Sequence, residues 1–204
     1  MLLGLGETLM NEFQSHSQAG QDQWVWEMTE HKADGFYVDL GCSDAQKHSN
    51  SYALEQLGWK GLLVDIVDGC ELRKGTFIKS DAATPNDRLK LYYSHLPAVV
   101  DYLSLDTDEA LMGSFAALPW DKVTFRVATI ETDVYRKGPH DRDNIRTMMK
   151  ALGYYLVCAD VCVEWPVGHA PVPYEDWFAM PELVNPDLIK RFKCDGKFWK
   201  HILA

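Results

Sequence analysis

The sequence predicts an α/β fold organised around a mostly parallel sheet. Residues 36–66 read as a strand, a glycine-containing turn, a helix and a second strand. Residues 36–40 and 62–65 are short apolar runs, the pattern of parallel strands that are covered on both faces. Further runs of this kind alternate with helical spacing along the chain, which favours one α/β domain over residues 1–204. Within it we expect an N-terminal helical segment over 1–30 and C-terminal loops with a helix over 166–204.

The amino-acid composition and net charge of the chain exclude several classes of protein. The 204 residues are 47% hydrophobic, enough for a sizeable core, and the net charge is −10. This acidity disfavours nonspecific binding to nucleic acid or to an anionic membrane. The N-terminus has no positively charged start, and the chain has no stretch of about 20 apolar residues. The five cysteines are an odd number without a paired spacing, which indicates reduced thiols in a cytoplasmic protein and no zinc site. The oligomeric state stays open.

The first half of the chain supplies three of the predicted strands. A helix is expected from Asp22 because Trp24, Val25 and Met28 fall on one face, and Gly35 ends the segment. The remaining elements predicted here are a short helix over 1–14, strands over 36–40, 62–65 and 75–79, and a helix over 50–57 that stops at Gly58. The segment 86–96 is compatible with either helix or strand.

The second half continues the alternation. We expect strands over 101–106 and 125–130, helices over 109–118 and 141–152, β-rich residues over 154–165 and a last helix over 186–192. The helix over 109–118 has an apolar stripe and stops at Pro119, and Asp106 with Glu109 resembles a capping box. Five prolines between 166 and 186 predict loops.

Acidic residues follow several of the predicted strands. Asp39 and Asp65 close the first two strands, and Asp106 closes the strand over 101–106. Ligands of open α/β sheets bind at this edge, where the strand order switches. An acid at the end of the second strand suits the two hydroxyls of a ribose. The pattern therefore predicts a nucleoside-containing cofactor.

Eight segments of the sequence resemble FkbM-type S-adenosylmethionine-dependent methyltransferases in order and spacing. They are SQAGQDQWV (17–25), FYVDLGCSDA (36–45), SNSYALEQLGWKGLLVDI (49–66), SDAAT (80–84), DYLSLDTD (101–108), FRVATIETD (125–133), KALGY (150–154) and YEDWF (174–178). The resemblance implies a Rossmann-like class I methyltransferase fold with a seven-stranded sheet flanked by helices. It also implies S-adenosylmethionine as methyl donor and O-methylation of a sugar or small-metabolite hydroxyl.

The sequence departs from this family at three places. Ala45 stands where the first motif usually has a second glycine. Asp108 and Glu109 replace the usual Glu-Gly after the fourth strand, which puts an extra acid near the acceptor. Thr132 and Asp133 replace the usual His-Asn after the fifth strand, so a base must come from another side chain.

The resemblance assigns the cofactor residues. Asp39 and Gly41 would serve the amino-acid end, because glycine permits close backbone approach and a carboxylate can meet the ammonium. Asp65 would accept from both ribose hydroxyls, and Asp81 with Ala82 would meet the adenine edge. Three N-terminal residues would either close over the methionine end or form a turn and helix cap: Gln18, Gln21 and Asp22.

Several acidic residues are expected near the acceptor, the molecule that would receive the methyl group. Asp106, Glu131 and Asp133 are the predicted catalytic residues, because a hydroxyl acceptor needs a base that removes its proton. His140 and Asp108 are further candidates. With Asp108, the three acids could also bind Mg²⁺, or they could simply form a solvated acidic rim. Tyr174, Trp177 and Phe178 would either wall the acceptor pocket or pack in the core.

Two other interpretations of the function remain open. An NAD-dependent oxidoreductase would also use an acid after the second strand, but the glycine-rich pyrophosphate motif is absent from residues 39–45. A methyltransferase-like protein that binds a ligand without turnover would explain the missing histidine. The leading prediction is a methyltransferase with a small-molecule or glycan acceptor and no nucleic-acid or membrane partner.

Overall fold

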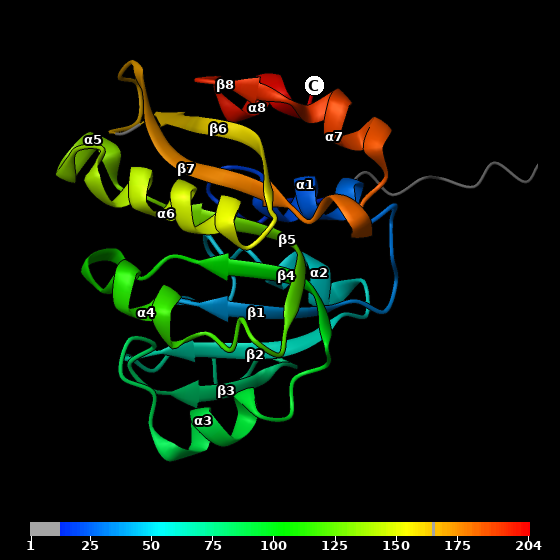
Figure 1. Cartoon of the computed structure of the whole chain (residues 1–204), viewed down its shortest axis with the longest axis vertical. Coiled ribbons are helices and arrows are strands. Elements are labelled where there is room, and N and C mark those ends of the chain that lie inside the picture. The colour runs from blue at the N-terminus through cyan, green and yellow to red at the C-terminus, as the bar shows by residue number, and fades with distance from the viewer. Residues whose placement is uncertain (1–12, 165) are drawn as a thin grey trace, which may run out of the picture.

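The structure, a computed structural model, describes residues 13–164 and 166–204 and contains one continuous sheet of eight strands (Figure 1). The strand order is β3-β2-β1-β4-β5-β7-β6-β8. The strands are β1 (Phe36–Leu40), β2 (Lys60–Asp65), β3 (Thr76–Lys79), β4 (Val99–Leu105), β5 (Thr124–Glu131), β6 (Tyr155–Glu164), β7 (Pro171–Ala179) and β8 (Cys194–Asp195). The helix predicted over 1–14 falls almost entirely outside the described residues.

The sheet confirms the predicted mostly parallel architecture. Strands β3, β2, β1, β4 and β5 are mutually parallel, whereas β7 runs antiparallel to both β5 and β6. The two-residue β8 pairs parallel to β6 and adds an eighth strand to the expected seven. The order reverses at β1, with β2 on one side and β4 on the other, so the carboxyl ends of these three strands border one crevice.

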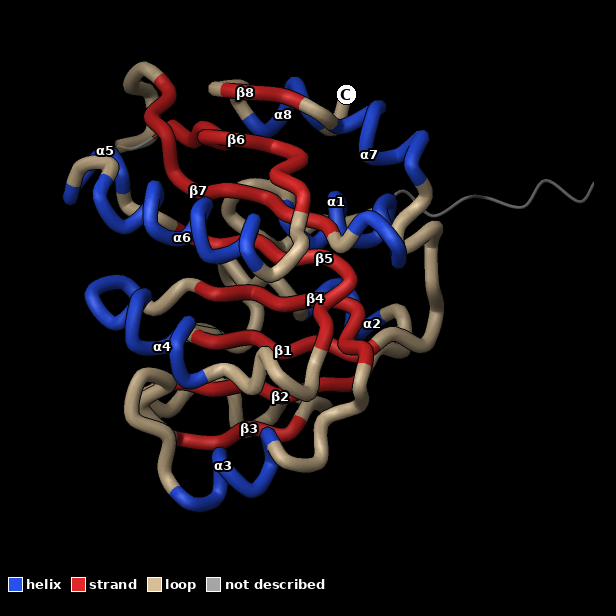
Figure 2. Tube along the Cα trace, viewed as in Figure 1, coloured by secondary structure: helices blue, strands red, loops and turns tan. Residues whose placement is uncertain are grey.

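Helices cover both faces of the sheet (Figure 2). The core on one face contains side chains of α3, α4 and α6, and the core on the other face contains side chains of α1, α2, α7 and α8. Side chains alternate between the two cores along a strand, as Tyr37 and Val38 of β1 do. The helices are α1 (Gln21–Met28), α2 (Tyr52–Gln56), α3 (Asp87–Tyr93), α4 (Leu111–Ala117), α5 (Val134–Lys137), α6 (His140–Ala151), α7 (Pro186–Phe192) and α8 (Trp199–Ile202), with 3₁₀ turns η1 (Asp108–Ala110) and η2 (Pro181–Leu183).

Strand β7 is the main departure from the sequence prediction, which placed loops here. Pro171 and Pro173 lie at its beginning, before the residues 175–179 that pair with β5. Proline lacks an N–H, so it is tolerated where a strand has no partner on that side. Trp177 and Phe178 of β7 are buried, one in each core, so they belong to the core and not to an acceptor wall.

The structure decides two local predictions that concern the N-terminal ends of helices. The ambiguous segment 86–96 forms α3, because the Asn86 side chain accepts a hydrogen bond from the Leu89 N–H at 3.0 Å and starts the helix. The capping box predicted at Asp106 and Glu109 is wrong. The chain instead enters α4 through η1, whose first residue follows Thr107, and no side-chain cap bond forms there. Among the described residues, no helix combines the length and apolar character needed to span a membrane.

Gly41 allows the loop after β1 to touch the end of β4. Its φ of +88° is in the left-handed region, and a Cβ placed on it would lie 1.6 Å from the backbone oxygen of Asp106. Backbone bonds fix this approach: the Gly41 N–H donates to Val64 at 2.9 Å, and the Asp106 N–H donates to Leu40 at 2.9 Å. A side chain at position 41 would therefore separate strand ends that border the crevice.

We expect Gly41→Ala to destabilise the protein by about 3 kcal/mol or more, since it adds both left-handed strain and a backbone clash. Gly196→Ala is the matched control, because Gly196 has φ +62° and a Cβ added to it would meet nothing within 4 Å. The control should lose only about 1 kcal/mol. Denaturant unfolding of both variants measures the difference. Equal losses would show that close approach at Gly41 is unimportant.

Candidate functional site

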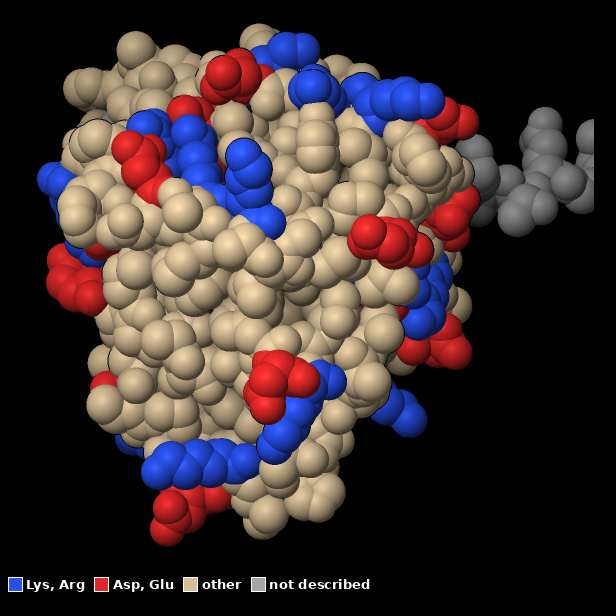
Figure 3. Space-filling view, viewed as in Figure 1, with Lys and Arg blue, Asp and Glu red and all other residues tan. Residues whose placement is uncertain are grey.

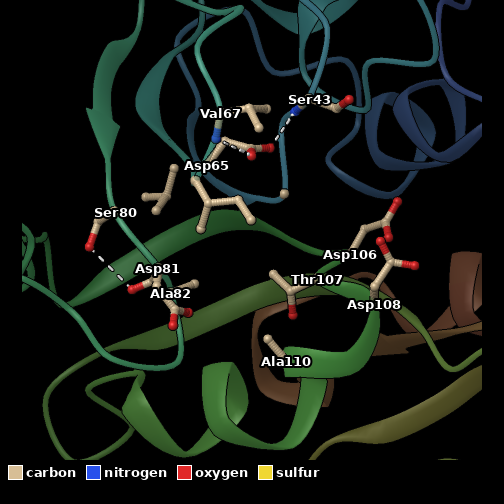
Figure 4. Close-up of a pocket in the computed structure, with 13 residues that line it drawn as sticks. Ser43, Asp65, Val67, Ser80, Asp81, Ala82, Asp106, Thr107, Asp108 and Ala110 are labelled. Carbon is tan, nitrogen blue, oxygen red and sulfur yellow. Dashed lines mark hydrogen bonds between the residues drawn. The ribbon is translucent and has the colours of Figure 1, made fainter.

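Two adjoining pockets open at the carboxyl ends of the parallel strands, and Figure 4 shows the larger one. The larger pocket, about 470 Å³, is bordered by the ends of β1, β2, β3 and β4. The smaller pocket, about 280 Å³, lies between the loop after β1 and the N-terminal segment that precedes α1. Gly41, Ser43 and Asp106 line both pockets, so one ligand can extend from the first into the second.

Asp65 presents a fixed carboxylate to the larger pocket. One oxygen accepts from the Ser43 N–H at 2.7 Å and the other from the Val67 N–H at 3.0 Å. The side chain is half-buried, and each carboxylate oxygen has a second acceptor site. Asp65 is thus oriented by the backbone and keeps capacity for two hydroxyl donors from the pocket.

Asp81 and Ala82 line the far end of the larger pocket, at the end of β3 (Figure 4). The Asp81 carboxylate accepts from the Thr84 hydroxyl at 2.8 Å and from the Ala83 N–H at 2.8 Å. These hydrogen bonds, that from Thr84 first, lower the pKa of Asp81. Its carboxylate therefore stabilises the turn that follows β3 at the border of the larger pocket.

Asp39 lines the smaller pocket and is almost fully buried. Burial raises the pKa of its carboxyl group, while a hydrogen bond from Ser51 and the charge of Arg73 oppose that change. Ser51 in turn accepts from the Arg73 guanidinium at 3.0 Å. Asp39 is thereby held through Ser51 and not by a direct ion pair.

Arg73 was not predicted as a site residue, yet its hydrogen bonds link separate segments of the chain around the smaller pocket. It is 8% exposed and pairs with Glu55 of α2 at 2.9 Å. Its remaining N–H groups donate to the loop after β1 and to the start of α2, at Ala45 O (3.1 Å), Ser49 Oγ (3.0 Å) and Ser51 Oγ (3.0 Å). The arginine lies in the loop between β2 and β3, and no motif or spacing in the sequence marks it.

The structure brings the three predicted catalytic acids together. Asp106 and Glu131 directly follow Leu105 and Ile130, which are paired in β4 and β5, and their carboxyl groups are in hydrogen-bonding contact. Burial, followed by the charge of Asp106, raises the pKa of Glu131; burial also raises the pKa of Asp106. Such a pair holds one proton over the neutral range and presents one carboxylate that can accept another.

Asp133 lies two residues after Glu131 and has cationic partners of its own. Burial alone would raise its pKa, but hydrogen bonds from Lys137 and Arg136 lower it. Arg136 and Lys137 of α5 also pair with Asp108 and Glu109. Carboxylate oxygens of Asp108, Glu109 and Asp133 lie within 4.8 Å of one another, but each of the three already pairs with Arg136, Lys137 or both. The arrangement therefore does not support the Mg²⁺ site that the sequence left open as one alternative.

The three N-terminal residues predicted to bind the cofactor have different positions relative to the pockets. Gln18 lines the smaller pocket. Gln21 is 1% exposed and lines neither pocket, and its side-chain oxygen accepts from the Ala19 N–H at 2.7 Å. Asp22 is fully buried and accepts from both Ser15 and Ser17 hydroxyls at 2.6 Å, so it organises the segment that borders the smaller pocket. His140 is exposed at the start of α6, with its ring beside Asp141.

No protein-family model matches the sequence, and no curated protein matches it. Several solved structures share the fold, among them the following two. A presumed rRNA methylase from Clostridium thermocellum is 11% identical over 81% of this chain and 97% of its own, with a TM-score of 0.51. A presumed RNA methyltransferase from Pyrococcus horikoshii is 11% identical over 78% of this chain and 83% of its own, with a TM-score of 0.50.

At these identities the likeness concerns the fold alone. The chain has the Rossmann-like α/β fold of methyltransferases, as predicted. The comparisons do not confirm the FkbM type, and the activity is therefore argued from the pockets.

A buried acid behind the site gives a pH-dependent prediction. Burial raises the pKa of Glu175 to about 8, against hydrogen bonds from Trp177 and Gln21. Between the ordinary pKa of about 4.5 and 8, the folded protein keeps a proton that the unfolded chain has lost. The free energy of unfolding therefore falls as the pH rises through this window.

We expect Glu175→Gln to remove this contribution, because the amide keeps an acceptor for the Trp177 indole and carries no charge. The variant should be more stable than the parent by about 1–3 kcal/mol at pH 7.5 and should match it near pH 4.5. Thermal unfolding at several pH values measures the effect. A variant that is less stable at every pH would mean that Glu175 is ionised in the folded protein.

Proposed function

We propose that this protein is an S-adenosylmethionine-dependent methyltransferase that methylates a hydroxyl group on a sugar or other small metabolite. The observation that carries the cofactor assignment is the Asp65 carboxylate at the end of β2. Two backbone N–H groups hold it in the larger pocket with free acceptor sites on both oxygens. A ribose offers two adjacent hydroxyl donors, which match this carboxylate.

The chain around Gly41 also fits this cofactor. Because position 41 has no side chain, the backbone between Leu40 and Cys42 forms a shared boundary of the two pockets beside Asp106. When bound, S-adenosylmethionine supplies an electrophilic methyl group on a cationic sulfur. Asp106 lies where the pockets meet, so its carboxylate places negative charge at the point where that cation would be positioned (Figure 4).

Asp106 and Glu131 also support the proposal that the acceptor is a hydroxyl group. A hydroxyl needs to lose its proton as it attacks, and a base within hydrogen-bond reach assists this step. The Asp106–Glu131 pair holds one proton and presents one carboxylate, so it can act as that base without the histidine common in the resembling family. Asp133, which contacts Glu131 and is held by Arg136 and Lys137, would keep the pair in place.

Charge supports a small acceptor that is not a polyanion. The residues at the pockets include Asp39, Asp65, Asp81, Asp106 and Asp108. On the face shown in Figure 3, Lys and Arg side chains lie mostly beside Asp and Glu. Arg142 and Arg146 of α6 pair with Asp160 and Asp176, respectively. An acidic pocket repels phosphate groups, whereas a neutral sugar hydroxyl is tolerated.

Binding of S-adenosylhomocysteine to the wild type and to Asp65→Ala tests the cofactor assignment. We expect the wild type to bind with micromolar affinity by isothermal titration and Asp65→Ala to bind at least about 10-fold more weakly, because it loses two hydrogen bonds to a charged group. Asp68→Ala is the matched control, since Asp68 is an exposed acid on the same loop. Equal binding by all three proteins contradicts the ribose assignment, and binding of NADH in place of S-adenosylhomocysteine favours an oxidoreductase.

A methyl-transfer assay tests the acceptor class. The protein is incubated with methyl-labelled S-adenosylmethionine and separate pools of neutral sugars, hydroxylated metabolites, phenols and RNA. We expect label on a hydroxyl oxygen of a small acceptor, and loss of at least about 100-fold in rate for Glu131→Gln and Asp106→Asn, which remove the base. Label on RNA alone would contradict the proposed acceptor and keep the cofactor. Binding of S-adenosylhomocysteine without transfer to any pool would favour a protein that binds without turnover.

A further inference from the structure

Two thiols meet where the loop after β1 packs against the loop after β2. Cys42 follows Gly41 and lines the smaller pocket, whereas Cys70 is fully buried and lines neither pocket. We propose that Cys42 and Cys70 form a reversible disulfide bond when a peroxide reaches them, and that this bond weakens binding of the S-adenosyl cofactor. The regulatory effect rests on the proposed function, because it takes that cofactor as the ligand of the two pockets.

The backbone holds the two sulfur atoms against each other. The Cys70 thiol donates to the Cys42 carbonyl oxygen at 3.7 Å and lies 3.9 Å from that of Ser43. A Cβ added to Gly69 would clash with the Ser43 carbonyl oxygen, so the two loops approach backbone to backbone just before Cys70. The Cys70 carbonyl oxygen accepts from the Arg73 N–H at 3.1 Å, which fixes the segment that carries the thiol. The two thiols are in hydrogen-bonding contact as a result.

This contact prepares the pair for oxidation. Thiolates react with peroxides, whereas protonated thiols react far more slowly. The hydrogen bond from Cys42 lowers the pKa of the Cys70 thiol against the effect of burial, and the charge of Arg73 also lowers it. Because the two sulfur atoms share a proton, the negative charge passes between them. Cys42 is the one that borders a pocket, so a small peroxide meets it first.

The reaction balances with hydrogen peroxide as the oxidant. The Cys42 thiolate attacks one peroxide oxygen, and the O–O bond breaks to give a sulfenic acid on Cys42 and hydroxide. The Cys70 sulfur then attacks the sulfenic sulfur, the S–O bond breaks, and the Cys70 proton leaves with the hydroxyl group as water. The two sulfur atoms together lose two electrons, which reduce the peroxide to water and hydroxide.

The disulfide changes the site through Ser43. Its two sulfur atoms are joined at about 2.05 Å, well inside the separation of two hydrogen-bonded thiols. Closing this gap draws together the loops that carry Ser43 and Asp65. The Ser43 N–H donates to the Asp65 carboxylate at 2.7 Å, so a shift at Cys42 disturbs the group proposed to hold the ribose (Figure 4). A ligand that fills the pockets favours the reduced form in turn, because linkage is reciprocal.

Mapping of disulfides after peroxide treatment tests the bond. The reduced wild type, Cys70→Ser and a control that combines Cys158→Ala with Cys194→Ala are incubated with just enough hydrogen peroxide to oxidise the wild type, and their peptides are identified by mass spectrometry without reduction. The control removes the thiol pair that joins β6 to β8 and lines neither pocket. We expect a Cys42–Cys70 disulfide in the wild type and in the control, formed about 3-fold or more slowly when S-adenosylhomocysteine is saturating.

Isothermal titration with S-adenosylhomocysteine on the same samples tests the effect on binding. We expect peroxide to weaken binding about 10-fold or more in the wild type and in the control, because the orientation of the Asp65 carboxylate is lost. Dithiothreitol should restore the affinity, which distinguishes a disulfide from oxidised methionine. Cys70→Ser should bind equally with and without peroxide, since Cys42 then has no thiol partner.

These results support the proposal. A wild type whose Cys42 and Cys70 stay unlinked overturns it, and so does an oxidised wild type that binds S-adenosylhomocysteine as the reduced protein does. If Cys70→Ser does not fold, the loss and its reversal by dithiothreitol in the wild type and the control decide in the same way. A reduced wild type that does not bind S-adenosylhomocysteine overturns the proposed function and with it the regulatory effect, whereas the peptide map still confirms or overturns the bond itself.

Discussion

The contact between the backbone at Gly41 and the end of β4 is the constraint on which the site depends. Parallel strands bring their carboxyl ends to one edge, but the side chains there meet only if the loops between them come close. At Gly41 the loop after β1 touches the backbone of Asp106, and the Gly41 N–H bonds to β2 at Val64. Asp65 and Asp106 both line the larger pocket, and the two pockets adjoin at Gly41 and Asp106, which line both.

A buried ion pair fixes the loop that completes the smaller pocket. Arg73 and Glu55 are both nearly inaccessible to water, and Glu55 also accepts from the Tyr37 hydroxyl. Buried ion pairs often contribute little net stability, because desolvation of two charges offsets their attraction. Their geometry is demanding, however, and here the guanidinium spans α2, the loop after β1 and the loop after β2. We interpret the pair as a contact that sets the conformation of the loop after β1.

Local patterns in the sequence were sufficient for most of the sheet and for part of the site. Apolar runs that end in acids gave the right positions for Asp39, Asp65 and Asp106, because strand ends determine where those side chains lie. Strand β7 was missed because its prolines indicate loops, and only the tertiary structure shows that they precede the pairing with β5. Arg73 could not be predicted, since the partners of its guanidinium lie 18–28 positions away in the chain. Gln21 had the expected spacing, but its side chain turns into the buried region beside Glu175.

A crystal structure of the protein with S-adenosylhomocysteine tests the central claim most directly, because it locates the nucleoside relative to Asp65. We predict adenosine in the larger pocket, both ribose hydroxyls within hydrogen-bond distance of the Asp65 carboxylate, and the thioether sulfur beside Asp106. A ligand bound elsewhere, or bound in this pocket with its ribose away from Asp65, would contradict the proposed site.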